Sequence, residues 1–258
     1  MSGTAGAAAP ILVMDTATSL VVIALGGADG TLRIEDSWSA GHRHSEELLP
    51  HLRDLLSRAG TRLADVSAIV VGTGPGTFTG LRVGLATAKA LAVSLGCPIV
   101  GVPTAAALVD ADRAACWVAR NAGADEPNGG DEPNGAGGPG DAGESLGRSA
   151  AVLVPAGPSD RVLFRDGVAT LVPAGTEPQD VAADGLIAVD LDGRAAPEAS
   201  ARGRAALDGL AAGLLRIGAR RLADGDVDDV ARLVPEYVTL PRGIREEHGA
   251  VEWSHSPR

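Results

Sequence analysis

The amino-acid sequence predicts an α/β protein. The first half alternates short aliphatic runs with helical segments in the order βββαβαβα. A glycine-rich segment, GTGPGTFTG at 72–80, joins a strand to a helix and allows the tight turn that such folds use. Hydrophobic residues make up 45% of the chain but aromatic residues only 2%, so the core must be aliphatic, as is common around parallel strands.

The chain begins with three predicted strands, at 11–14, 20–25 and 31–38. The segment DTATS at 15–19 separates the first two, and a turn-rich segment at 26–30 separates the second from the third. Such short connections favour an antiparallel meander.

The first helix is predicted from Ser45, which can cap it, with Glu46 and Glu47 in the first turn, where the helix dipole favours acidic side chains. Gly60 is expected to end it. One face of the helix is apolar: Leu48, Leu52, Leu55, Leu56 and Ala59.

A buried strand at 66–72 comes next, and after the glycine-rich turn a second helix is predicted over 81–95, ended by Gly96. A strand at 99–102 and a helix at 104–118 complete this half.

The second half is weaker in pattern. Residues 121–147 contain DEPNG twice and almost nothing that a core could bury, so the segment is interpreted as a disordered insertion. Beyond it we expect a strand at 150–155, a hairpin at 161–172 turning at Asp166–Gly167, a strand at 186–191 and a helix at 202–222.

These patterns divide the chain into five segments. They are a flexible N-terminus at 1–10, a first lobe at 11–118, the insertion at 121–147, a smaller second lobe at 150–240 and a flexible tail at 241–258.

The helix at 81–95 is apolar nearly all round, which predicts burial on more than one side. Gly80, Gly84, Ala88 and Ala92 recur every four residues and form a strip of small side chains along it. Such a strip allows another backbone to approach closely. The neighbour could be the helix at 45–57, another chain, or both.

Composition and charge exclude several function classes. The net charge of −11 argues against a protein that grips nucleic acid by itself, because phosphate binding depends on Lys and Arg. The glycine-rich turn lacks the Lys of a nucleotide-binding P-loop. Cys97 and Cys116 show no paired spacing, which favours reduced thiols. We recognise no signal peptide and no stretch that would span a membrane.

Four segments in order, DTATS, HSEELLP, GPGTFTGLRVG and GCPIVGVPT, resemble the TsaB (YeaZ) family over residues 11–108. The resemblance implies an actin-like, sugar-kinase-like (ribonuclease H-like) fold of two related lobes. It also implies a role as the dimerisation subunit of the bacterial complex that makes threonylcarbamoyladenosine in tRNA. This role is non-catalytic and cytoplasmic.

The same resemblance implies the partners. The catalytic paralogue TsaD is expected to bind the helices at 45–57 and 79–95, and the ATPase subunit TsaE to join the complex. A homodimer through the same surface is a further expectation, tRNA is contacted only indirectly, and ATP, ADP and metal belong to the partner subunits. The residues expected in the interface are Ser45, Leu48, Leu49, Leu52, Leu56, Gly76, Phe78, Thr79, Gly80, Arg82, Val83, Gly84, Thr87, Ala88 and Leu91.

No catalytic residue or metal ligand is expected in this chain. The catalytic paralogue carries an N-H-x-x-x-H pattern after the strand that corresponds to 99–102, and Thr104 and Leu108 stand where its histidines would be. Asp15, Thr16 and Thr18 occupy the place of the first phosphate loop of actin-like ATPases and are interpreted as its vestige. The alternative function is a small ATPase or phosphotransferase of this fold that acts on its own.

Overall fold

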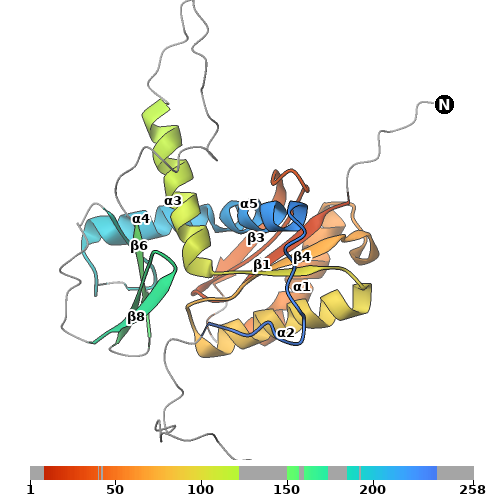
Figure 1. Ribbon diagram of the computed structural model, residues 1–258, viewed down its shortest axis with the longest axis horizontal. Coiled ribbons are helices and arrows are strands. Elements are labelled where there is room, and N and C mark those ends of the chain that lie inside the picture. The colour runs from red at the N-terminus through yellow and green to blue at the C-terminus, as the bar shows by residue number, and fades with distance from the viewer. Residues whose placement is uncertain are drawn as a thin grey trace, which may run out of the picture.

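The computed structural model describes residues 9–39, 41, 43–121, 150–156, 160–173, 185–191 and 193–236, which form two β-sheets with helices on and between them (Figure 1). The predicted insertion, from residue 122 onward, and the predicted tail at 241–258 lie outside the described residues. The same holds for residues 1–8 of the predicted N-terminal segment.

The first sheet contains β1 (Ile11–Asp15), β2 (Leu20–Gly26), β3 (Leu32–Ser39), β4 (Ala68–Gly72) and β5 (Ile99–Val102) in the order β3-β2-β1-β4-β5. The first three strands are antiparallel, whereas β4 is parallel to both β1 and β5. Strands β1, β4 and β5 are buried throughout because helices cover both faces of the sheet. The predicted order βββαβαβα is confirmed.

The second sheet contains β6 (Ala151–Pro155), β7 (Arg161–Arg165), β8 (Val168–Val172) and β9 (Leu186–Ala188) in the order β8-β7-β6-β9. Strands β6, β7 and β8 form an antiparallel meander, and β9 pairs with β6 in parallel. This is the arrangement of the first sheet without its fifth strand. The two related sheets confirm the predicted α/β fold of two lobes.

The hairpin of β7 and β8 turns where the sequence predicts. Asp166 and Gly167 have φ angles of 51° and 79°. A two-residue turn with both central residues in the left-handed region matches the twist of antiparallel strands, and Asp-Gly is well suited to it.

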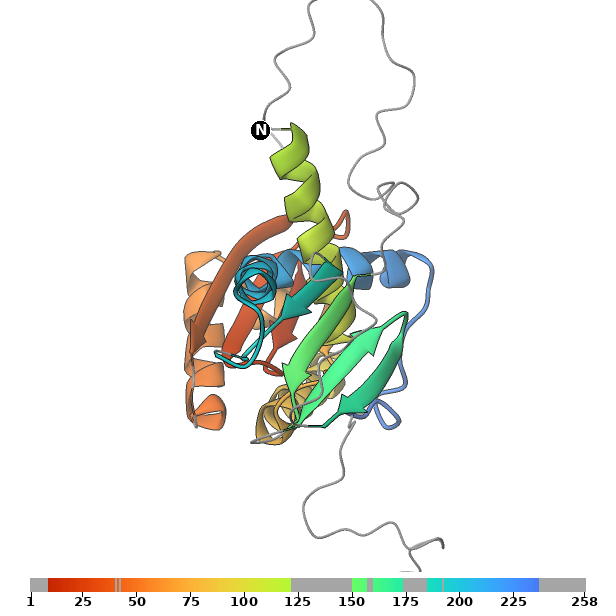
Figure 2. The ribbon, with the colours of Figure 1, turned by 90° about the vertical axis from the view of Figure 1, so that its left-hand side faces the viewer.

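Helices α1 (His44–Arg58) and α2 (Phe78–Leu95) cover one face of the first sheet, as Figure 1 shows. On the other face, α5 (Leu210–Ala223) packs against α3 (Thr104–Asn121), which also contacts α4 (Pro197–Asp208). One apolar cluster contains residues of both sheets and of these three helices, so the helices join the lobes into one body (Figure 2). The cluster includes Val13, Val70, Leu108, Val152, Ile187, Ala206 and Leu214.

Several predicted helix ends are wrong. Helix α1 begins at His44 after Arg43, with no side-chain cap, so Ser45 lies inside the helix. Helix α2 begins at Phe78 and so includes the last three residues of the glycine-rich segment. The helix predicted over 202–222 is two helices that meet at Gly209, where a Cβ atom would lie 2.9 Å from the Cβ of Ala111 in α3.

Part of the segment assigned to the second lobe, 150–240, packs on the first lobe. Helix α5 contacts β1, β2, β4 and β5 of the first sheet. The segment after it follows the edge of that sheet: the Asp228 amide donates to the Ile99 carbonyl at 2.9 Å, and the Glu236 amide donates to the Thr73 carbonyl at 2.8 Å. The chain therefore returns to the first lobe after α4.

Helix α2 also corrects an expectation about membranes. By length and apolar composition alone it could cross a bilayer, although the sequence suggested no such stretch. Its inner face packs on β1 and β4, as expected of a helix that belongs to a folded α/β core.

Candidate partner-binding site

The strip of small residues on α2 faces the sheet of the same chain. Gly80, Gly84, Ala88 and Ala92 are all buried. A Cβ atom at Gly84 would lie 2.2 Å from the Thr16 hydroxyl oxygen, and one at Gly80 would lie 2.0 Å from the Thr16 carbonyl oxygen. At Gly80 and Gly84 the strip thus allows the loop after β1 of the same chain to approach the helix backbone.

This packing corrects the predicted interface. Gly80, Gly84 and Ala88 are inaccessible to a partner, and Leu48 of α1 is 1% exposed. Gly76 is half-buried and packs on the loop after β1, since a Cβ atom there would lie 2.1 Å from the Ala17 carbonyl oxygen.

The opposite face of α2 is exposed and apolar. Ala86 and Ala90 are exposed, and Val93 is 70% exposed. These residues follow helical spacing and carry no charge, so this face offers a partner a smooth apolar surface. Sequence reasoning missed them, although their phase, opposite to Gly84 and Ala88, is visible in the sequence.

The cations of α2 lie beside this face. The Arg82 guanidinium lies over the Phe78 ring, 3.6 Å from its centroid, where the aromatic face attracts the positive charge. The Lys89 ammonium donates to the Leu233 carbonyl at 3.0 Å, which ties α2 to the segment after α5.

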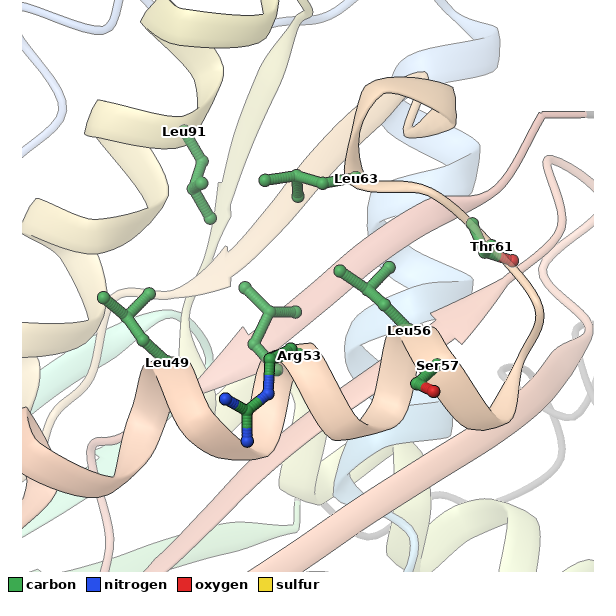
Figure 3. Close-up of a pocket in the computed structure, with 8 residues that line it drawn as sticks. Leu49, Arg53, Leu56, Ser57, Thr61, Leu63 and Leu91 are labelled. Atoms are coloured by element: carbon green, nitrogen blue, oxygen red, sulfur yellow. The ribbon is translucent and has the colours of Figure 1, made fainter.

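A groove of about 430 Å³ runs between α1 and α2. Leu49 of α1 and Leu91 of α2 face each other across it, and Leu63, from the short 3-10 helix Leu63–Asp65, points into the same space (Figure 3). Leu49 is 55% exposed. The lining residues are Leu49, Leu52, Arg53, Leu56, Ser57, Thr61, Leu63 and Leu91.

The groove brings together part of the predicted interface and adds to it. Four of the lining residues belong to the interface expected from the sequence: Leu49, Leu52, Leu56 and Leu91. The other four were not predicted: Arg53, Ser57, Thr61 and Leu63. Phe78 and Thr79 are exposed at the start of α2, Arg82 is exposed, and Val83 and Thr87 are half-buried. Ser45 belongs to α1, but its side chain is not among those that the structure describes.

Asp15 lies at the end of β1 and is fully buried. Its carboxylate accepts hydrogen bonds from the Thr104 hydroxyl at 2.6 Å and from the Ala17 amide at 2.8 Å. Burial disfavours the charged form and raises the pKa of Asp15 to about 6, although both hydrogen bonds oppose the shift. The Thr104 oxygen also accepts from the Gly74 amide at 3.1 Å, so this cluster joins β1, the glycine-rich segment and α3.

The threonines of the loop interpreted as a vestigial phosphate loop make hydrogen bonds within the chain. The Thr16 hydroxyl donates to the Gly80 carbonyl at 2.6 Å, and the Thr18 hydroxyl donates to the Leu20 carbonyl at 2.9 Å. The Thr77 amide donates to the Ala17 carbonyl at 2.7 Å, so the glycine-rich segment packs directly on the loop. Both threonine hydroxyls are thus committed to the chain's own backbone, and a phosphate could not use them without breaking these bonds.

No group of three or more metal-ligating side chains occurs among the described residues. His51 Nδ1 instead lies 2.8 Å from an Asp36 carboxylate oxygen, and its ring stacks on Trp38 at 3.7 Å between centroids. Cys97 and Cys116 form no disulfide, and partial burial raises the pKa of Cys97.

Comparison with known proteins places these features in context. Residues 38–126 match the family TsaD, tRNA N6-adenosine threonylcarbamoyltransferase. The tRNA threonylcarbamoyladenosine biosynthesis protein TsaB of Escherichia coli is 39% identical over 94 residues, which cover 36% of this chain and 40% of that protein. TsaB of Haemophilus influenzae is 32% identical over 101 residues, or 39% of this chain and 42% of that protein. The chain thus spans less than half the length of the curated relatives it matches.

The fold comparison extends further along the chain. The structure of YeaZ from Pseudomonas aeruginosa superposes with a TM-score of 0.60 at 20% identity, covering 89% of this chain and all of that one. Both lobes therefore share the YeaZ fold. The resemblance of this chain to the TsaB (YeaZ) family is thereby confirmed, in the sequence of its first lobe and in the fold of both lobes.

Proposed function

We propose that this chain is a non-catalytic subunit that acts in threonylcarbamoyl transfer to adenosine of tRNA by binding and activating the catalytic paralogue TsaD. The observations that carry the proposal are the apolar groove between α1 and α2 and the exposed apolar face of α2. Contiguous apolar surface on a folded protein commonly marks an interaction site.

The similarity of this chain to the TsaD family supports TsaD as the partner. Residues 38–126 match the TsaD family, and this region contains both groove helices. Two related chains that present the same pair of helices can pack them about a pseudo-twofold axis, as identical chains do about a true one. The same surface would serve a homodimer when TsaD is absent.

The non-catalytic role is supported by the residues after β5. Thr104 and Leu108 stand where the resemblance places the two histidines of the catalytic paralogue, and both are fully buried. The Thr104 hydroxyl is already committed to Asp15. The resemblance to the TsaB (YeaZ) family further implies that metal, ATP and ADP belong to TsaD and the ATPase subunit TsaE, that tRNA contact is indirect, and that the complex acts in the cytoplasm.

The test is reconstitution of tRNA modification from purified TsaD and TsaE of the same organism, with the threonylcarbamoyl donor supplied and this chain present or absent. We expect threonylcarbamoyladenosine to form only when the chain is present, while the chain alone forms none and releases no ADP from ATP. Equal modification without the chain, or steady ATP hydrolysis by the chain alone, would contradict the proposal and favour an independent ATPase.

A further inference from the structure

A carboxylate of the second lobe binds the loop after β1. The Ser19 amide donates to Asp190 Oδ2 at 2.6 Å, and the Ser19 hydroxyl donates to Oδ1 of the same carboxylate. Ser19 immediately precedes β2 of the first sheet, and Asp190 follows β9 of the second. The contact therefore links the two lobes where the chain leaves β1 and β9, on sheets that lie side by side in Figures 1 and 2.

Asp190 is held in place from several directions. Its neighbours Val189 and Leu191 are each 1% exposed, and its carbonyl accepts a hydrogen bond from the Arg194 guanidinium at 3.2 Å. Its φ of 57° lies in the left-handed region, which Asp tolerates better than most residues. A side chain anchored in this way presents both carboxylate oxygens to Ser19.

The pair of donors at Ser19 is the pattern by which loops recognise anions. A backbone N–H and a side-chain O–H aimed at two oxygens of one group bind a phosphate or a carboxylate equally well. The Thr16 and Thr18 hydroxyls of the same loop donate to carbonyls of the chain. The donors of Ser19, in contrast, point across to the second lobe.

We propose that Asp190 is an internal anion that occupies the Ser19 donor pair, holds the two lobes together at this loop and excludes phosphate-bearing ligands from it. The chain would thus carry an anion site that its own second lobe keeps filled. This inference does not depend on the proposed function, since neither residue belongs to the α1/α2 groove.

The test uses Asp190→Gly, which removes the carboxylate and suits the left-handed backbone. Asp166→Gly is the matched control, because Asp166 is likewise an Asp with positive φ in the second lobe. Amide exchange and chemical shift of Ser19 are followed by NMR in the full chain, with and without inorganic phosphate. We expect exchange at Ser19 to accelerate about tenfold or more in Asp190→Gly and to stay unchanged in Asp166→Gly.

Added phosphate tests the anion site separately from the link between the lobes. It should shift the Ser19 amide resonance in Asp190→Gly and leave that resonance unchanged in the wild type. Unchanged exchange in Asp190→Gly would overturn the link between the lobes, and faster exchange without a phosphate shift would overturn the anion site. If Asp190→Gly does not fold, Ser19→Ala removes one of the two bonds from the other side and should still accelerate exchange. TsaD binding should be unaffected by any of these variants, so failure here leaves the proposed function standing.

Discussion

At the scale of single residues, Asp15 is an ionisable group that the fold removes from water. Its carboxyl is fully buried, and its pKa rises from 3.8 to about 6. The sequence marks Asp15 as the end of a strand beside a loop, but it cannot show that the glycine-rich segment closes over it. That closure depends on contacts with Gly74 and Thr104, which are distant in the sequence.

The raised pKa predicts a pH dependence of stability. Because the folded state binds the proton of Asp15 more tightly than the unfolded chain does, the free energy of unfolding should fall as the pH rises from about 4 to about 6 and then level off. Asp15→Asn removes this ionisation. Its stability relative to wild type should therefore increase across the same window, by up to about 3 kcal/mol.

Urea denaturation of both proteins at several pH values between 4 and 8 measures this difference. A difference between Asp15→Asn and wild type that is the same at every pH would show that Asp15 does not titrate in this range.

At the scale of elements, α2 packs by one face and exposes the other. The sequence identifies the helix as important and as apolar nearly all round, and it cannot say which apolar face is inside. A strip of small residues fits a partner helix and a close loop equally well, and here the loop after β1 approaches it, with Thr16 against Gly84. The strip, whose neighbour the sequence leaves open, is approached at Gly80 and Gly84 by a loop of its own chain.

This packing predicts that Gly84→Ala destabilises the fold. The new methyl group would lie 2.2 Å from the Thr16 hydroxyl oxygen, so the loop or the helix must shift. We expect the free energy of unfolding to fall by about 1–3 kcal/mol, the usual effect of overpacking a core. Ala86→Leu, on the exposed face of the same helix, should change it by less than about 0.5 kcal/mol. Thermal and urea unfolding measure both, and equal stability of the two variants would contradict the packing described.

Most strands and helices of the first lobe follow from the sequence, because each has a clear aliphatic run or period and a Gly or Pro near its end. The hairpin at Asp166–Gly167 follows for the same reason. The sequence does not show that α3 passes close to Gly209, where α4 and α5 meet, because Ala111 of α3 is distant along the chain. The groove residues Arg53, Ser57, Thr61 and Leu63 were also missed, since they become neighbours of Leu91 only when α1 and α2 pack together.

At the scale of the whole molecule, the two sheets share one strand arrangement but are covered by different helices. The first sheet is covered by α1 and α2 on one face and by α5 on the other, and the segment from Asp226 to Glu236 follows its edge. The groove lies on the face away from α3, α4 and α5 (Figure 1). This arrangement leaves α1 and α2 free to meet a second molecule while the remaining helices hold the lobes together.

The most direct test of this account is the affinity for TsaD of a variant on the exposed face of α2. Val93→Arg places a charge on that face, whereas Val118→Arg makes the same change at a 58% exposed valine of α3. Titration calorimetry with purified TsaD should show binding by Val93→Arg to be roughly tenfold weaker or more, since a buried unpaired charge is costly, and Val118→Arg should bind like wild type. Circular dichroism should show both variants folded. Wild-type affinity in Val93→Arg would contradict the assignment of this face to the partner.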